Sequence, residues 1–172
     1  MFKDAILNNI IKEMQIVRRL STKIPSDKVH YKHKEDVRSI LEVLQYLTIC
    51  GTGFVQYWYR KDQSDFQTFY VPLRAKAATV THETFLTAMD EQIALIKSLF
   101  ANISEEDLLN KIVDYPWGDK APLGEALIQT SIKWLAAYKL QLFSLIKHAT
   151  DQKLTTPDAW RLTEIEPVEQ NQ

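Results

Sequence analysis

Four segments of this chain repeat apolar residues at spacings of three and four, the period of an amphipathic α-helix. They span residues 2–21, 35–59, 81–101 and 122–149. In the first segment, Ile6, Ile10, Met14 and Val17 form one apolar face. Glycine and proline, which supply the frequent turns of β-proteins, number only four and six among 172 residues. The pattern therefore predicts an all-α fold built on four long helices.

The predicted helices differ in how much of their surface is apolar. Segment 35–59 is apolar on two sides and is expected to be the most buried, with Gly51 and Gly53 marking a close approach to a neighbouring helix. Thr81 is the expected N-cap of segment 81–101. The predicted inward stripe of segment 122–149 consists of Leu127, Thr130, Trp134, Tyr138, Gln141 and Leu145.

The connection over residues 60–78 breaks the helical period and is long for a helical bundle. Such a length favours a crossover that spans the bundle between the second and third helices. We therefore expect one domain over residues 1–150, a four-helix bundle with one long crossover. Residues 151–172 are expected to form a tail that docks through Trp160 and is otherwise loose.

Composition excludes several classes of function. With 21 basic and 22 acidic residues the net charge is −1, which argues against a nucleic-acid binder that works by general electrostatics. A single cysteine, Cys50, excludes a disulfide framework and a cysteine-built zinc site. The apolar stretch 40–59 contains Glu42 and Gln45 and is interpreted as a buried helix, so no membrane span is expected. Residues 1–4 lack the pattern of a secretion signal, and we expect a cytoplasmic protein.

Three short stretches carry a family resemblance. The first is Ser-Ile-Leu-Glu-Val-Leu-Gln-Tyr-Leu at 39–47, and the second is the Pro-Trp-Gly loop at 116–118 that leads into Pro-Leu-Gly-Glu at 122–125. The third is Trp-x-x-x-Tyr-Lys-Leu-Gln-Leu at 134–142. In this order and spacing, over about residues 2–150, they resemble the DinB-like superfamily, also called YfiT-like metal hydrolases. In that family the pattern on the second helix is Ser-Ile-x-Glu-x-Leu-x-His-Leu, and the pattern on the fourth helix is His-x-x-x-His.

The resemblance implies an up-down-down-up bundle that is often dimeric. In active members it implies three histidines that hold zinc or nickel, and the best understood branches resemble thiol-dependent transferases. In this chain the three histidine positions are occupied by aromatic residues, namely Tyr46, Trp134 and Tyr138.

These replacements decide what the site can hold. An indole nitrogen carries a hydrogen and offers no lone pair to a metal, and a neutral phenol with a pKa near 10 is a poor ligand. We therefore expect no metal and no cofactor. Two interpretations stay open for Tyr46, Trp134 and Tyr138. They either fill the core as packed rings, or they line a small-molecule pocket in which the tyrosine hydroxyls orient a ligand and the indole stacks on it.

Glu42 and Cys50 lie near Tyr46 in the sequence and carry groups capable of chemistry. Glu42 is a secondary site candidate, either as a buried general base or as a carboxylate paired with Lys or Arg at the mouth of the bundle. Cys50 is interpreted as a buried structural thiol, because no histidine is spaced to activate it.

The four histidines do not form a metal-binding pattern. His30 and His33 lie in a polar loop without an obvious third ligand. His82 is expected on the surface at a helix start, and His148 suits the dipole at a helix C-terminus.

Aromatic residues are dense at 57–59 and again at Phe66, Phe69 and Tyr70. Some are expected to cap the bundle end, and any that stay exposed would favour a homodimer contact. The leading hypothesis is a metal-free DinB-like protein, a non-catalytic or metal-independent small-molecule binding or structural protein. The alternative is a metal-dependent DinB-like enzyme, a thiol-dependent S-transferase or hydrolase with a non-standard site.

Overall fold

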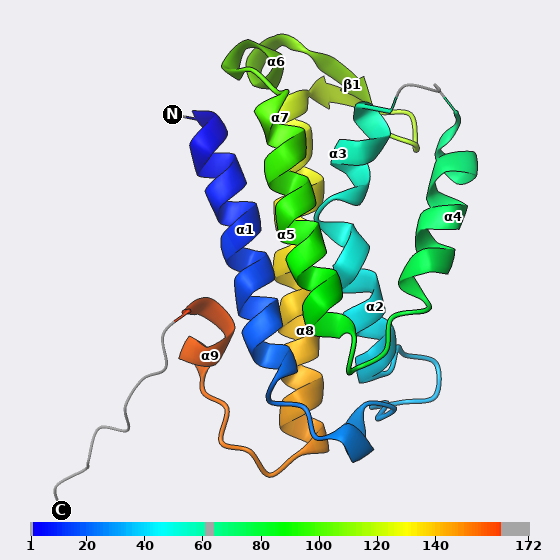
Figure 1. Cartoon of the computed structure of the whole chain (residues 1–172), viewed down its shortest axis with the longest axis vertical. Helices are drawn as coiled ribbons and strands as arrows, with labels where there is room; N and C mark the ends of the chain where they lie inside the picture. The colour runs from blue at the N-terminus through cyan, green and yellow to red at the C-terminus, as the bar shows by residue number, and fades with distance from the viewer. Residues whose placement is uncertain (1, 61–63, 163–172) are drawn as a thin grey trace, which may run out of the picture.

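A computed structural model describes residues 2–60 and 64–162 of the chain. These residues are mostly helical, in agreement with the all-α prediction, and they include a short two-stranded hairpin (Figure 1). The elements in chain order are α1 (Phe2–Ser21), η1 (Ser26–Lys28), α2 (Ile40–Cys50), α3 (Gly53–Trp58), α4 (Phe66–Ala77), α5 (Phe85–Ala101), α6 (Glu105–Asn110), β1 (Ile112–Asp114), β2 (Lys120–Pro122), α7 (Leu123–Leu127), the π-helical turn η2 (Ile128–Ile132), α8 (Lys133–Ala149) and α9 (Thr156–Trp160).

Helices α1, α2, α5 and α8 contribute buried apolar side chains to the core. Helix α1 packs against α5 and α8, and α2 packs against the same two helices. Helices α2 and α5 run in one direction while α1 and α8 run in the other (Figure 1). Met14, Leu47, Phe100 and Leu142 are fully buried between them, so the apolar stripes of the sequence meet in one core. No helix within residues 2–60 and 64–162 is long and apolar enough to cross a membrane.

The predicted second helix is shorter than expected and is interrupted. It begins at Ile40, because Ser39 and Glu42 form a capping box that fixes the first turn. The Ser39 hydroxyl accepts the Glu42 backbone N–H at 3.2 Å, and the Glu42 carboxylate accepts the Ser39 N–H at 2.6 Å. Helix α2 ends at Cys50, and α3 begins two residues beyond Gly51.

The prediction of a non-helical crossover is wrong for residues 66–77, which form α4. Asp65 caps this helix by accepting the backbone N–H groups of Gln67 at 2.9 Å and Thr68 at 3.0 Å. Pro72 inside the helix and the lack of a clean apolar stripe hide it from periodicity. Helix α4 lies on the outside of α2 and α3 and carries the chain back to the start of α5 (Figure 1).

Two further boundaries differ from the sequence prediction. Helix α5 begins at Phe85 with Thr84 as N-cap, because Thr81 belongs to a preceding turn in which its backbone N–H donates to the Thr84 hydroxyl at 2.9 Å. The loop before the fourth helix contains β1 and β2, paired antiparallel with Val113 opposite Ala121. Gly118 turns this hairpin with a φ of 102°, which favours glycine. Three-residue strands are too short to show an alternating pattern.

The inward face of α8 is centred one residue away from the predicted stripe. Trp134, Tyr138 and Gln141 are half-buried at its margin. The fully buried side chains of α8 are Leu135, Lys139, Leu142 and Ile146. The sequence pattern missed this face because a lysine stands at its centre, and lysine is seldom buried unless it is paired.

Lys139 is held in the core by an ion pair. Its Nζ lies 2.6 Å from the Glu13 Oε2 of α1, although the angles fall outside ordinary hydrogen-bond geometry. Helix α9 covers this pair, with the Trp160 ring centroid 4.1 Å from the same Nζ. Arg19 fastens α9 to α1 by donating to the Asp158 carbonyl at 2.7 Å. Residues 163–172, where a loose tail was expected, lie outside the described residues.

The Glu13–Lys139 pair makes a testable contribution to stability. The Glu13 side chain is only 16% exposed. Replacing Lys139 by methionine therefore leaves a largely buried carboxylate without its partner. We expect the free energy of unfolding to fall by about 3 kcal/mol, the usual cost of breaking a buried pair. The double variant Glu13→Leu/Lys139→Met removes both charges and should lose much less than the two single variants together. Urea denaturation measures all four proteins, and additive losses would contradict the coupling.

The expected close approach holds at Gly51 and not at Gly53. A Cβ at Gly51 would overlap the Met14 side chain and lie 2.8 Å from Leu135 Cδ1. A Cβ at Gly53 would meet Leu73 at 3.5 Å and Tyr70 at 3.6 Å, which is ordinary contact. Side chains of α1 and α8 therefore approach the backbone after α2 so closely that a Cβ at Gly51 would displace them.

These two glycines form a matched pair for mutagenesis. Gly51→Ala should lower the free energy of unfolding by about 1–3 kcal/mol, the cost of overpacking a core. Gly53→Ala should be neutral or raise it by about 0.5–1 kcal/mol, because alanine has the higher helix propensity. Thermal denaturation of both variants checks this, and equal stabilities would show that the α2 contact is not tight.

Candidate functional site

Tyr46 of α2 and Tyr138 of α8 meet across the helix interface. Their ring centroids are 4.4 Å apart with the planes tilted by 55°. The guanidinium of Arg38, from the segment before α2, lies 4.7 Å from the Tyr46 ring centroid and 5.2 Å from that of Tyr138. Two of the three candidate residues thus form one cluster, with a cation placed on both rings.

Trp134 belongs to a different cluster. It lies one helical turn from Tyr138 and packs edge-on against Phe54 of α3, with centroids 5.1 Å apart at 79°. Its ring centroid also lies 6.4 Å from that of Trp117. Over residues 2–60 and 64–162, no ring contact joins Trp134 to Tyr46 or Tyr138. Ring contacts therefore place Tyr46 and Tyr138 in one cluster and Trp134 in another.

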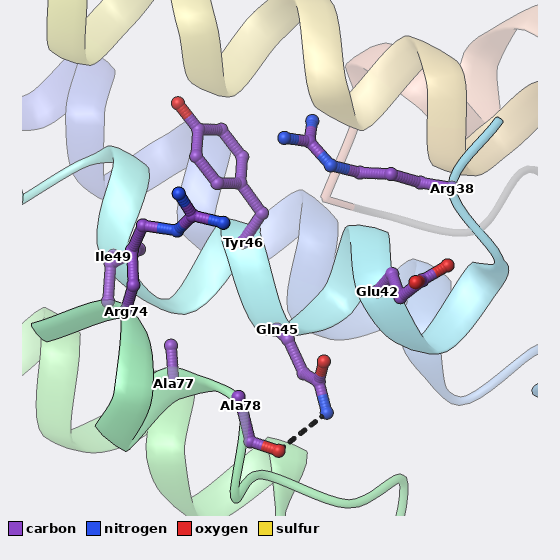
Figure 2. A pocket seen from close by; sticks show the side chains of 8 residues that line it. All are labelled: Arg38, Glu42, Gln45, Tyr46, Ile49, Arg74, Ala77 and Ala78. Atoms are coloured by element: carbon purple, nitrogen blue, oxygen red, sulfur yellow. Dashed lines mark hydrogen bonds between the residues drawn. The ribbon is translucent and has the colours of Figure 1, made fainter. Parts of the chain in front are cut away.

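A cleft of about 220 Å³ opens beside Tyr46, between α2 and α4. Figure 2 shows the Tyr46 ring between the guanidinium groups of Arg38 and Arg74, which extend toward it from two sides. Gln45 spans the floor by donating its Nε2 to the Ala78 carbonyl at 3.0 Å and the Val80 carbonyl at 2.9 Å. The lining residues are Arg38, Glu42, Gln45, Tyr46, Ile49, Arg74, Ala77 and Ala78. Arg74 belongs to α4, a helix that the sequence pattern did not predict. Its position at this cleft was therefore not predicted either.

The side chains of Tyr46, Trp134 and Tyr138 do not fit a metal. Two phenols in ring contact and an indole in a separate cluster supply no set of three converging donors. Within the part of the chain that the structure describes, no three His, Cys, Asp or Glu side chains are grouped so that they can hold an ion. No chemical step is therefore assigned to a metal here.

The surroundings of Tyr46 in the cleft shift the pKa of its hydroxyl. Burial raises the pKa of Tyr46 well above its ordinary value, and the neighbouring Tyr70, Cys50 and Tyr138 raise it further. Burial likewise raises the pKa of Tyr70, against the opposing effect of its hydrogen bond with Tyr46. Both hydroxyls stay protonated at neutral pH, so this pair offers hydrogen bonds and no general base.

Glu42 is exposed rather than buried. Its carboxylate accepts the Ser39 backbone N–H at 2.6 Å and pairs with Lys32 Nζ at 3.3 Å. The Ser39 hydrogen bonds, and then Lys32, hold the pKa of Glu42 below its usual value. Of the two alternatives for Glu42, the geometry matches the paired carboxylate, and a lowered pKa is the opposite of what a general base at neutral pH needs.

Among the described residues, Cys50 does not have the surroundings of a reactive thiol, and the histidines do not form a set of metal ligands. Cys50 is 3% exposed, and burial raises the pKa of its thiol, which disfavours the reactive thiolate. His33 and His148 meet with ring centroids 5.0 Å apart, a contact that the sequence pattern did not reveal. Both are exposed, and no third candidate ligand among the described residues joins them.

The dense aromatic residues form the second cluster around Phe54. This ring is 2% exposed and contacts Trp58, Phe66, Trp117 and Trp134 at centroid distances of 5.1–6.1 Å. Trp117 in the hairpin remains 54% exposed. The cluster caps the end of the helices beside α3, as the sequence suggested for part of it, and most of its rings are half-buried or buried.

A scan against models of protein families finds none that matches the chain, and a search of curated proteins finds no significant match.

The raised tyrosine pKa values predict a loss of stability in alkali. An unfolded tyrosine ionises near pH 10, before the folded Tyr46 does, so raising the pH above this point favours the unfolded chain. Burial raises the pKa of Tyr59 to about 12, which adds to the same trend between about pH 10 and 12.

In Tyr46→Phe this decline should be shallower by up to about 1.4 kcal/mol per pH unit, the value for one proton. Urea denaturation at a series of pH values from neutral to about pH 11 measures the slope. Because the variant also loses a hydroxyl contact at neutral pH, the slope and not the absolute stability is the readout. Identical slopes in the two proteins would show that Tyr46 ionises normally.

Proposed function

We propose that this chain is a metal-free DinB-like four-helix bundle that binds a small molecule in the cleft beside Tyr46. The observation that carries the proposal is the Tyr46–Tyr138 pair. Where the family resemblance places two metal-binding imidazoles, this chain has two rings in contact at 4.4 Å, beside a cleft of about 220 Å³. Concave sites with an aromatic wall and a few polar groups are the usual form of small-molecule sites.

The chain path supports the bundle part of the proposal. In the up-down-down-up topology the second and third core helices run in the same direction and need a crossover. Helices α2 and α5 run the same way, and α4 connects them along the outside (Figure 1). We infer that α1, α2, α5 and α8 are the four helices of the bundle and that α3 and α4 belong to the crossover.

The position of the rings favours binding over pure packing. If all three aromatic residues served only to fill the former metal site, they would be expected to share one buried cluster. Tyr46 is instead half-buried at the cleft, while Trp134 joins the Phe54 cluster.

The metal-dependent transferase or hydrolase stays the alternative function, and it requires a ligand set other than these three residues.

A homodimer stays a prediction of the sequence pattern and the family resemblance. The exposed Trp117 and the exposed Leu109 and Ile112 near it in sequence are the apolar residues that such a contact would cover.

Two measurements on the full chain test the proposed function. Elemental analysis of protein purified without chelator should find zinc and nickel well below one ion per chain, and a stoichiometric ion would overturn the metal-free assignment. A screen of small fragments by amide NMR should shift the resonances of Gln45, Ile49 and Ala77. Tyr46→Ala should abolish these shifts and Tyr59→Ala, a half-buried tyrosine outside the cleft lining, should retain them. A screen in which no fragment moves the cleft resonances would contradict the binding function.

A further inference from the structure

The cleft beside Tyr46 carries an excess of positive charge. Arg38 and Arg74 reach it from the segment before α2 and from α4, and both guanidinium groups extend toward the Tyr46 side chain (Figure 2). Neither arginine forms an ion pair with a carboxylate among the described residues. Two uncompensated guanidinium groups in one small cleft repel each other and attract an anion.

The one acidic residue of the lining does not neutralise them. The Glu42 carboxylate is occupied by the Ser39 backbone N–H at 2.6 Å and by Lys32 at 3.3 Å. In Figure 2 it points away from the two guanidinium groups. The capping box of α2 therefore holds the negative charge at the rim and leaves the arginine side of the cleft positive.

Arg38 is positioned before any ligand arrives. Its guanidinium rests on the rings of Tyr46 and Tyr138 at 4.7 Å and 5.2 Å from their centroids. Stacking on aromatic faces restrains a flexible side chain while its N–H edge stays available for hydrogen bonds. A restrained donor loses less conformational entropy on binding, which favours recognition of a carboxylate or phosphate.

The remaining walls limit the size of the occupant. Ile49, Ala77 and Ala78 are apolar, and Gln45 has both Nε2 hydrogen bonds satisfied by the carbonyls of Ala78 and Val80. A volume of about 220 Å³ is room for roughly seven waters at about 30 Å³ each. The space suits one anionic group with a short apolar or aromatic body, and a long chain would have to extend into solvent.

We propose that the cleft binds a small organic anion whose carboxylate or phosphate is attracted by the guanidinium groups of Arg38 and Arg74 and whose apolar part packs against Tyr46. This inference rests on the proposed function, since it names the chemical class of the ligand for the same cleft. The acidic group is recognised by charge and by the fork geometry of arginine, and the body by ring contact.

Three probes with one ring separate charge from shape. Benzoate carries a carboxylate, phenyl phosphate carries a phosphate, and benzyl alcohol is neutral. Titrations followed by amide NMR should show one or both anions binding at the cleft at least about tenfold more tightly than the alcohol, the scale of one charge-assisted hydrogen bond. The preferred anion identifies the acidic group, and binding should weaken as salt is added because the arginines are exposed.

Variants assign the effect to the two arginines. Arg74→Gln should weaken anion binding at least about tenfold and leave the alcohol unaffected. Arg38→Lys keeps the charge and should still weaken it, because lysine lacks the planar fork. Arg161→Gln removes the same charge from an exposed site outside the lining and should change nothing. Thermal denaturation verifies that each variant folds.

The outcomes separate this inference from the proposed function. If the alcohol binds at the cleft as tightly as the anions, or if Arg74→Gln binds anions like the native chain, the anion class is wrong while the binding cleft stands. If neither the probes nor the fragment screen move any cleft resonance, both the inference and the proposed function fail.

Discussion

The structure depends on the interface along which α2 and α3 pack against α8. Three contacts follow one another along it, from the Tyr46–Tyr138 rings, through Gly51 against Leu135, to Phe54 against Trp134. The glycine in the middle lets the two helices come together, and the rings on either side fill the wider spaces. Because all three contacts share one interface, the spacing at Gly51 also sets where Tyr46 and Tyr138 meet.

The two ends of this interface carry aromatic clusters in different surroundings. At the α3 end the Phe54 ring is buried among its neighbours, of which Trp134 is half-buried and Trp117 is exposed. At the α2 end Tyr46 is only half-buried, and α4 lies over it without filling the space. Arg38 stacks on the tyrosine pair there, so rings that support the core on one side orient a cation on the other.

A second polar feature lies on the buried face of α8, where it meets α1. Lys139 occupies the centre of the buried face and is neutralised by Glu13, and α9 covers both. A buried pair of this kind is weak evidence for added stability. It does fix which face of α8 turns inward, and it gives the residues after α8 a definite place to pack through Trp160 and the Arg19–Asp158 contact.

The amino-acid sequence by itself determined the helical class, the extent of α1 and α5 to within a few residues, the aromatic cap and the lack of good metal ligands at Tyr46, Trp134 and Tyr138. These follow from local rules, since the period of apolar residues and the chemistry of a side chain do not depend on distant parts of the chain. Periodicity did not reveal α4, whose Pro72 and mixed surface obscure it, or the burial of Lys139, which depends on a partner in α1.

Only the tertiary structure decided that Tyr46 and Tyr138 touch while Trp134 packs elsewhere, and that Arg74 joins Arg38 at one cleft. The physical reason is that these placements depend on how far α2 and α8 approach each other and on where α4 crosses them. Both are set by long-range packing that no single segment encodes.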